Sequence, residues 1–301
     1  MASILKLLKN PAKVVYVLDR IGVSRIIPDR TYLSLKYRAN FGKKLNLKTP
    51  QTYNEKLQWL KLYDRKPEYT VMVDKYEAKK YVADRIGEEY IIPTLGVWDK
   101  VEDIDFDSLP NQFVLKCTHD SGGIVICRDK AKFNINEAKK KLEKSLKNNF
   151  YYFNREWPYK NVKPRIIAEQ YMEDKETGEL RDYKFFSFNG TTKALFIATE
   201  RQKVGEEVKF DFYNMEFEHL DFRQGHPNST SEIKKPITFA EMWKLSERLS
   251  NKIPHVRVDF YEVNGKVYFG ELTFFHHAGM IPFDPEEWDY VWGSWLTLPQ
   301  K

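Results

Sequence analysis

Three charged residues near the C-terminus have types and spacing that suit phosphate chemistry. Arg257 and Asp259 lie two residues apart, so their side chains share a face if the segment is a strand. The Asn264-Gly265 pair predicts a two-residue hairpin turn, and pairing about it sets Asp259 opposite a position at or before Glu271, depending on the register. Two carboxylates and a guanidinium would then converge at the open end of the hairpin.

Such a convergence is typical of sites that bind nucleotide phosphates. Hard cations such as Mg²⁺ take carboxylate oxygens and keep positions for phosphate, while arginine forks onto phosphate or carboxylate oxygens. Glu271 stands in an apolar run between Phe269 and Phe274, where an unpaired carboxylate would be costly. The alternative is a hairpin with an ordinary solvated face. The hairpin motif alone does not decide between this and a phosphate site.

A glycine-containing loop further upstream is a candidate phosphate cover. The loop THDSGG follows a short apolar segment that ends with Lys116. Its two glycines, Gly122 and Gly123, let backbone amides approach a ligand closely, and Ser121 adds a donor. The ordinary alternative is a tight turn in a hairpin.

Helices and hairpins must position these residues. A helix that begins at Thr52, with Glu55 completing a capping box, is followed by predicted helices over 74–87, 136–149 and 239–252. Strands are predicted over 91–98, 113–117, 123–127, 165–171, 181–188 and 192–199, in addition to the hairpin. The last two form a second hairpin about Asn189-Gly190, and Lys184 lies among aromatic residues in the first of these two strands. We therefore predict an α+β fold with antiparallel sheets.

Composition indicates a globular protein rather than a disordered or membrane-spanning one. Of its 301 residues, 42% are hydrophobic and 31% are charged, enough to build one large domain or two to three smaller ones. No apolar run approaches the roughly 18 residues that span a bilayer, and the N-terminus lacks the pattern of a secretory signal. We expect a cytoplasmic location, with contact at the inner face of the membrane as an option. Two cysteines are too few for a disulfide scaffold.

The N-terminal segment is strongly basic. Residues 1–50 hold eleven Lys or Arg and two Asp, a net charge of +9, which leaves −3 for the rest of a chain whose total is +6. Apolar residues alternate with lysines from Ile4 to Leu18 in an amphipathic pattern that Pro11 interrupts. Such a helix can lie on an anionic membrane or bind an acidic partner, or it can simply pack with a solvated basic face. Nucleic acid is not an expected partner, because no zinc-finger spacing, RNA-binding aromatic motif or long basic tail occurs.

Seven elements occur in an order that resembles the ATP-grasp superfamily. They are Lys75 in VDKY, Lys116 in FVLK, the loop CTHDSGG, Glu169 in IIAEQY, Lys184 in DYKFFSFNG, the pair Arg257 and Asp259, and Glu271 in GELTFF. The segments NEKLQWLKLYDR and IGEEYIIPTLGVWD are similar to the TupA-like branch, which is linked to teichuronopeptide and capsular polysaccharide biosynthesis. The resemblance implies two α+β subdomains that grip ATP, over 71–168 and 169–301, preceded by a basic, mainly helical segment over 1–70.

The resemblance also implies a role for each matching position. Lys75, Lys116 and Lys184 would face the ATP phosphates beneath the loop of Ser121, Gly122 and Gly123, and the linker of Glu169, Gln170 and Tyr171 would bind the base. Asp259 and Glu271 would hold Mg²⁺ with Thr273 beside them, and Arg257 would stabilise the transferred phosphoryl group. Thr273 replaces the usual Asn, which favours one firmly held Mg²⁺ over two. Apart from the resemblance, His276 is a candidate to bind the acceptor or accept a proton, or else a polar loop residue beside His277.

The activity that the resemblance implies is ATP- and Mg²⁺-dependent ligation of a carboxylate to an amine through an acyl phosphate. The polysaccharide context suggests a uronic acid of a saccharide as the acceptor and an amino acid or other amine as the nucleophile. Other possibilities are an ATP-dependent sugar kinase, a glycosyltransferase of the same biosynthesis, and a non-catalytic nucleotide-binding protein docked to the membrane.

Overall fold

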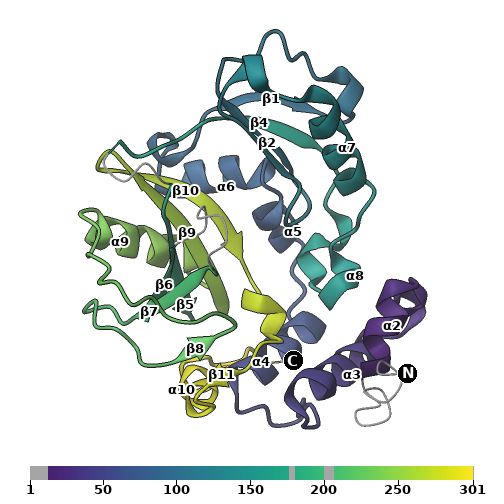
Figure 1. The fold of residues 1–301 in the computed structure, drawn as a ribbon. Coiled ribbons are helices and arrows are strands. Elements are labelled where there is room, and N and C mark those ends of the chain that lie inside the picture. The colour runs from purple at the N-terminus through teal and green to yellow at the C-terminus, as the bar shows by residue number, and fades with distance from the viewer. Residues whose placement is uncertain (1–12, 176–179, 200–206, 301) are drawn as a thin grey trace.

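The computed structural model describes residues 13–175, 180–199 and 207–300, which form two main antiparallel sheets (Figure 1). The first has the order β1 (Thr94–Trp98), β4 (Ile166–Gln170), β2 (Phe113–Cys117) and β3 (Ile124–Cys127). The second has the order β10 (Lys266–Thr273), β9 (His255–Val263), β5 (Asp182–Phe188), β6 (Thr191–Thr199) and β7 (Lys209–Tyr213). The short strands β8 (Arg223–Gln224) and β11 (Phe283–Asp284) pair separately. The predicted α+β class with antiparallel sheets is confirmed.

The α-helices surround these sheets. They are α2 (Val14–Arg20), α3 (Asp29–Phe41), α4 (Tyr53–Tyr63), α5 (Glu68–Val73), α6 (Glu77–Ile86), α7 (Ile135–Leu146), α8 (Tyr151–Asn154), α9 (Phe239–Ser250) and α10 (Glu287–Trp295). The predicted capping box at the start of α4 is confirmed: the Thr52 hydroxyl accepts from the Glu55 amide at 3.2 Å, and the Glu55 carboxylate accepts from the Thr52 amide at 3.3 Å.

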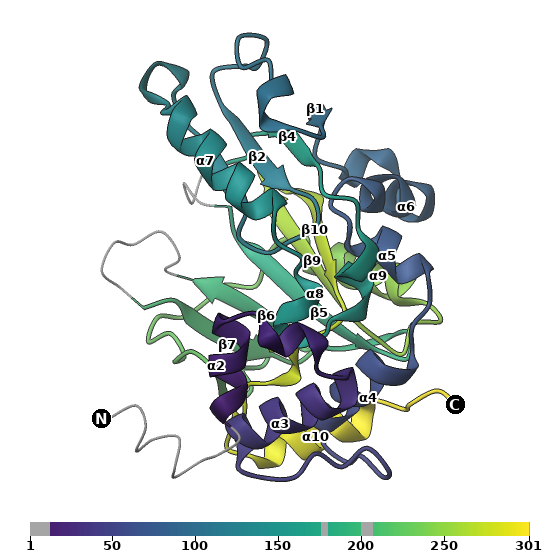
Figure 2. The ribbon, with the colours of Figure 1, turned by 90° about the vertical axis from the view of Figure 1, so that its right-hand side faces the viewer.

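The four-stranded sheet has one face in a core and the other toward the five-stranded sheet. Along β2, Phe113, Leu115 and Cys117 are buried on the face that α7 covers (Figure 2). Because side chains alternate along a strand, Val114 and Lys116 lie on the opposite face, where they line a cavity between the sheets. This alternation of side chains along β2 is the reason that Lys116 lines the cavity.

Two Asn-Gly turns shape the five-stranded sheet. The backbone angle φ is 50° at Asn189 and 84° at Gly190, and 52° at Asn264 and 73° at Gly265. Two consecutive left-handed residues are what a two-residue hairpin of this type requires. Both predicted hairpins are confirmed, and β9 lies between β10 and β5.

The predicted division into segments 1–70, 71–168 and 169–301 stays a prediction, and one hydrophobic core contains residues from all three segments. Leu57 of α4 and Val82 of α6 are buried with the strands of the five-stranded sheet, and the boundary after residue 168 falls inside β4. Residues of α2 and α3, among them Val15, form a further small core together with Ala278 and Met280. Periodicity identifies the apolar face of a helix but not the surface on which that face packs. The sequence therefore could not show which core these helices join.

The contact between α10 and α4 depends on Gly293. A Cβ atom at this position would overlap the Gln51 carbonyl and come within 2.9 Å of the Tyr53 amide nitrogen. Both neighbours are backbone atoms at the start of α4, so they cannot move aside cheaply. We expect Gly293→Ala to lower the free energy of unfolding by about 3 kcal/mol in urea titration, whereas Ser294→Ala, an exposed change on the same helix, should stay within about 0.5 kcal/mol.

His255 gives the protein a specific acid sensitivity. Its Nδ1 donates to the Ser187 carbonyl and its Nε2 accepts from the Tyr53 hydroxyl, both at 3.0 Å, and burial lowers its pKa to about 3. The unfolded chain takes up this proton below about pH 6.5, whereas the folded protein does not, so stability is lost as the pH falls. Wild type should have a higher free energy of unfolding than His255→Gln in urea titration. This difference should decrease by about 2 kcal/mol between pH 7.5 and pH 5. A pH-independent difference would contradict this.

Candidate active site

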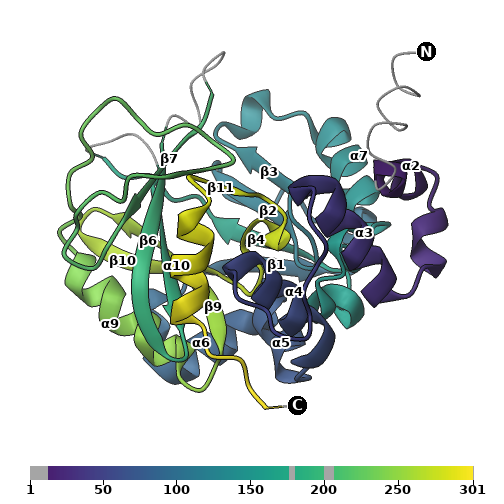
Figure 3. The ribbon, with the colours of Figure 1, turned by 90° about the horizontal axis from the view of Figure 1, so that it is seen from below.

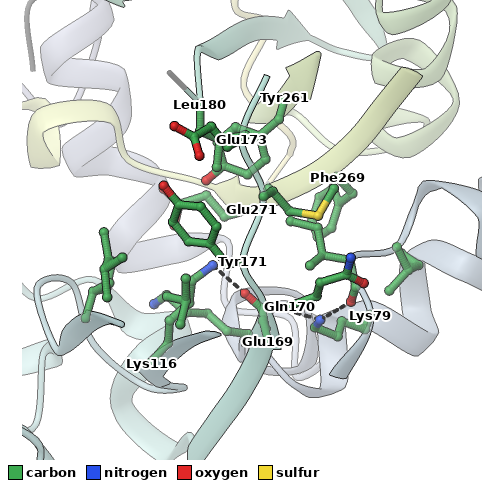
Figure 4. A pocket seen from close by; sticks show the side chains of 18 of the residues that line it. Lys79, Lys116, Glu169, Gln170, Tyr171, Glu173, Leu180, Tyr261, Phe269 and Glu271 are labelled. Carbon is green, nitrogen blue, oxygen red and sulfur yellow. Dashed lines mark hydrogen bonds and ion pairs between the residues drawn. The ribbon is translucent and has the colours of Figure 1, made fainter. Parts of the chain in front are cut away.

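A cavity of about 690 Å³ lies between the two sheets, within the size range of small-ligand sites. The four-stranded sheet supplies its floor, and the β9–β10 hairpin supplies residues on the other side (Figure 4). Its apolar lining residues include Ile91, Ile92, Val114, Ile124, Ile126, Met172, Leu180 and Phe269. Its cationic lining residues are Lys75, Lys79, Lys116 and Arg128. A ligand with a flat apolar part and a polyanionic part fits these walls.

Glu169 organises two of the lysines. Its carboxylate lies 2.6 Å from Lys79 Nζ and 2.5 Å from Lys116 Nζ (Figure 4). Burial alone would raise the pKa of Glu169, but the two ammonium groups hold it below its ordinary value. The carboxylate therefore stays ionised and keeps both lysines at the cavity wall, where they can meet an anion.

Lys75 connects the cavity to the glycine-containing loop. Its Nζ donates to the carbonyl of Asp120, and the loop is anchored further by the Ser145 hydroxyl, which donates to the Asp120 carboxylate. A Cβ atom at Gly123 would overlap Ser145, and Gly122 has a φ of 115°, so both positions need glycine. Lys75 lines the cavity, but Ser121, Gly122 and Gly123 do not. That this loop covers bound phosphate stays a prediction.

The main chain leaves the four-stranded sheet after Gln170 and continues along the cavity. β4 lies between β1 and β2, so the backbone through Gln170 runs inside the sheet, and the Gln170 amide donates to the Pro93 carbonyl. Tyr171, Met172 and Glu173 follow the strand and line the cavity with Gln170. That the linker of Glu169, Gln170 and Tyr171 binds the base stays a prediction.

A bulge at Gly270 fixes the register of the β9–β10 hairpin. The pairing shifts between Phe269 and Glu271, so Glu271 stands opposite Asp259 and Thr273 stands opposite Arg257. On its other side β9 pairs with β5, which sets Lys184 opposite Asp259. The convergence predicted from the sequence is confirmed, and Lys184 joins it.

Arg257 is the hub of this cluster. Its guanidinium donates to both Asp259 oxygens at 2.7 Å, to Glu271 at 3.2 Å and to the Thr273 hydroxyl at 3.0 Å. Lys184 Nζ lies 2.5 Å from Asp259. Burial alone would raise the pKa of Asp259, but Arg257 and Lys184 hold it below its ordinary value. Lys184 also lies 3.4 Å from Asp182, so these two cations stand among three carboxylates at the edge of the cavity.

Asp259, Glu271 and Thr273 fit a hard cation in the chemistry of their donors. All three offer oxygen atoms, and Glu271, with 41% of its side chain exposed, also lines the cavity. Within the described residues there is no cluster of three or more His, Cys, Asp or Glu arranged for a metal. Asp259 is 1% exposed, and its two oxygens are already bonded to Arg257 and Lys184, so Mg²⁺ held there would displace one of these contacts and complete its shell with phosphate and water.

His276 is a partner of Arg257 and not a free base. Its Nδ1 lies 2.8 Å from Arg257 Nη1, and since arginine can only donate, Nδ1 accepts and the proton resides on Nε2. Burial lowers the pKa of His276 well below its ordinary value, so the ring stays neutral. This contradicts the expectation that His276 accepts a proton, because its lone pair is already used.

Two buried residues of α4 hold the loop η7 (His276–Gly279) that carries this histidine. Gln58 Nε2 and Lys61 Nζ donate to the Ala278 carbonyl at 3.1 and 2.6 Å. The loop is left-handed at His277 (φ 48°) and Ala278 (φ 55°), a conformation that is strained for residues other than glycine. The bonds from α4 therefore maintain the backbone that presents His276 to Arg257.

Several residues of the site were not found from the sequence. Lys79, Arg128 and Glu173 line the cavity. Lys79 had a usable signal, because it follows Lys75 by four residues and so shares its side of the helix predicted over 74–87. A fourth, Glu156, is buried near Lys61 and Arg257, and burial raises its pKa; its position before Trp157-Pro158 gives no hint of this.

A ligand-sized cavity between two α+β layers, with lysines on one wall and an Arg-x-Asp and Glu hairpin on the other, defines an ATP-grasp architecture. The model of the TupA-like ATP-grasp family matches residues 55–297, and the chain belongs to this family. The fold and family expected from the sequence are therefore confirmed. Comparison with curated protein sequences gave no significant match.

Solved structures with a related fold are distant. The D-alanine–D-alanine ligase from Bacillus anthracis complexed with ATP is 17% identical with a TM-score of 0.39, over 68% of this chain and 54% of that chain. The corresponding ligase from Helicobacter pylori is 14% identical with a TM-score of 0.42, over 81% and 69%. The ATP-grasp ligase PsnB, complexed with its minimal precursor, is 10% identical with a TM-score of 0.40, over 84% and 67%. This chain thus spans only about half the length of the first of these ligases.

Proposed function

We propose that this protein is an ATP-dependent carboxylate-amine ligase that attaches an amine or amino acid to a uronic acid of a cell-surface polysaccharide or its precursor. The observation that carries the proposal is the lysine-lined cavity that ends at the Arg257, Asp259 and Glu271 hairpin. Membership of the TupA-like family supports the polysaccharide context. The reaction would take place in the cytoplasm, where ATP is available.

The lysines, the carboxylates and Arg257 have different roles in the proposed reaction. Lys75, Lys79 and Lys116 offset the charge of the ATP phosphates, and the apolar cavity wall accepts the base. Asp259 and Glu271 would hold Mg²⁺, which would offset the charge that shifts during phosphoryl transfer. Arg257 stands beside both carboxylates, so its guanidinium is placed to stabilise the same charge.

The proposed reaction has two balanced steps. A carboxylate oxygen of the uronic acid attacks the γ-phosphorus of ATP, the bond to the β-phosphate oxygen breaks, and ADP leaves with an acyl phosphate remaining. The amine nitrogen then attacks the acyl carbon, inorganic phosphate leaves with the former carboxylate oxygen, and the amine loses a proton. An amide, ADP and phosphate are the products.

Trapping of the acyl phosphate tests this proposal. Purified protein is incubated with Mg²⁺, ATP and glucuronic or galacturonic acid, free or as oligosaccharides, and hydroxylamine replaces the unknown amine. We expect a hydroxamate on the saccharide and an equal amount of ADP, neither of which forms with Asp259→Asn. A matched saccharide that lacks the carboxylate is the substrate control.

Other products would overturn the proposal. A phosphosugar formed with the neutral saccharide would indicate a kinase, and AMP would indicate adenylation. Stabilisation against heat by nucleotide-sugars but not by ATP would favour a glycosyltransferase. ATP binding without turnover across a panel of uronates and amines would favour a non-catalytic nucleotide-binding protein.

A further inference from the structure

Helix α2 exposes the face that a surface helix normally hides. Val14, Val17 and Ile21 recur at spacings of three and four, so they form one stripe along the helix. The stripe faces outward, since Ile21 is 63% exposed and Val17 is 43% exposed, while Val15 on the opposite side is fully buried. Ile26, in the 3-10 turn after the helix, is 84% exposed. Such a continuous apolar stripe indicates a binding surface.

The charges around this stripe have one sign. Lys13 and Arg20 are exposed and lie seven residues apart, so they flank the stripe along one edge. Among residues 13–48 every charged residue that is exposed, rather than buried or half-buried, is Lys or Arg. The two carboxylates of this segment are used inside the protein: Asp19 binds Lys36 at 3.2 Å, and Asp29 binds Arg65 at 2.7 Å.

We infer that the α2 surface, formed by Lys13, Val14, Val17, Arg20, Ile21 and Ile26, docks the protein on an anionic lipid bilayer. Apolar side chains beside a basic edge match the acyl boundary and the headgroups of such a membrane. A second copy of this chain is disfavoured because two cationic surfaces repel, and nucleic acid offers no match for the apolar stripe. The inference stands independently of the proposed reaction.

The position of α2 suits a peripheral contact. It lies at the edge of the molecule, beyond α3, in two perpendicular views (Figures 1 and 3). In the described part of the chain, no helix is both long and apolar enough to traverse a bilayer. The small core of Val15, Ala278 and Met280 ties this surface to the loop that carries His276. A docked protein would therefore hold its active-site loop at a fixed position relative to the membrane.

Vesicle sedimentation of the full chain tests the inference. We expect wild type to sediment with vesicles of phosphatidylglycerol and phosphatidylcholine but not with phosphatidylcholine alone, and binding should weaken as salt is raised. The variant Lys13→Gln/Arg20→Gln should bind about 25-fold more weakly, about fivefold for each charge. Its matched control is Lys80→Gln/Lys132→Gln, which removes two exposed lysines elsewhere and should bind within about twofold of wild type.

The apolar contribution is tested separately. Ile26→Glu should reduce vesicle binding at least about tenfold, whereas Ile237→Glu, at a site 89% exposed and outside the α2 surface, should change it by no more than about twofold. Melting temperatures of all variants establish that they are folded. Wild-type sedimentation that is equal with neutral and anionic vesicles, or equal losses in Ile26→Glu and Ile237→Glu, would overturn the inference. So would concentration-dependent dimerisation that Ile26→Glu abolishes in a protein that does not bind vesicles.

Discussion

Replacing Arg257 with lysine is expected to lower kcat about 10²- to 10³-fold while ATP binding changes little. Lysine keeps the charge but has no planar fork, so it cannot reach Asp259, Glu271, Thr273 and His276 at once. Arg257 is not part of the cavity lining, so the contacts of ATP should survive. Turnover is measured as ADP release with the uronate and hydroxylamine, and ATP affinity is measured by calorimetry.

A second arginine serves as the control for this substitution. Arg223 pairs with Asp284 at 2.7 Å on the exposed β8–β11 ribbon, so Arg223→Lys makes the same chemical change in an ion pair outside the site. We expect its turnover to remain within about twofold of wild type, since exposed pairs contribute little. If Arg257→Lys turned over ATP as fast as Arg223→Lys, the assigned role of Arg257 would be wrong.

Changing Glu169 to glutamine is expected to lower the free energy of unfolding of the ATP-free protein by about 3–5 kcal/mol. The change leaves Lys79 and Lys116 without the carboxylate that they share at 2.6 and 2.5 Å. Glutamine also presents an amide donor to one of the two ammonium groups, which adds repulsion. Urea unfolding of wild type and variant measures the loss.

ATP should stabilise the Glu169→Gln variant and offset part of this loss, because its phosphates supply the negative charge that Glu169 no longer provides. The rise in melting temperature on adding ATP is therefore expected to be larger in Glu169→Gln than in wild type. Glu77→Gln is the matched control: Glu77 binds Arg165 at 2.8 Å but is half-exposed, so its loss should cost less than about 1 kcal/mol. If Glu169→Gln were as stable as wild type and ATP did not raise its melting temperature, Glu169 would not belong to the phosphate site.

Local signals in the chain were sufficient for some of its elements, whereas α3, α10 and β7 were not predicted. The Asn-Gly pairs specify their turns because the left-handed backbone they need is open to few residues, and the capping box at Thr52 needs only partners three residues apart. The order of the lysines, the Arg-x-Asp pair and Glu271 was likewise sufficient to indicate the family. These features depend on neighbours in sequence or on motif order, which a single chain displays directly.

Tertiary structure decided how the elements meet. The bulge at Gly270 selected Glu271 as the partner of Asp259, since a shift of one residue reverses the face of every side chain beyond it. Packing placed Lys79 beside Glu169, turned His276 back onto Arg257, and set Lys61 of α4 against the loop after the hairpin. These contacts join residues from 19 to more than 200 positions apart.

The sequence by itself thus determined the chemical groups of the site and the strands and helices that carry them. Only the folded chain decided that Arg257 is held from four directions and that the basic helix turns its apolar stripe outward. The physical reason is that periodicity defines which side chains share a face, whereas the surface that covers this face, or leaves it open, is set by long-range packing.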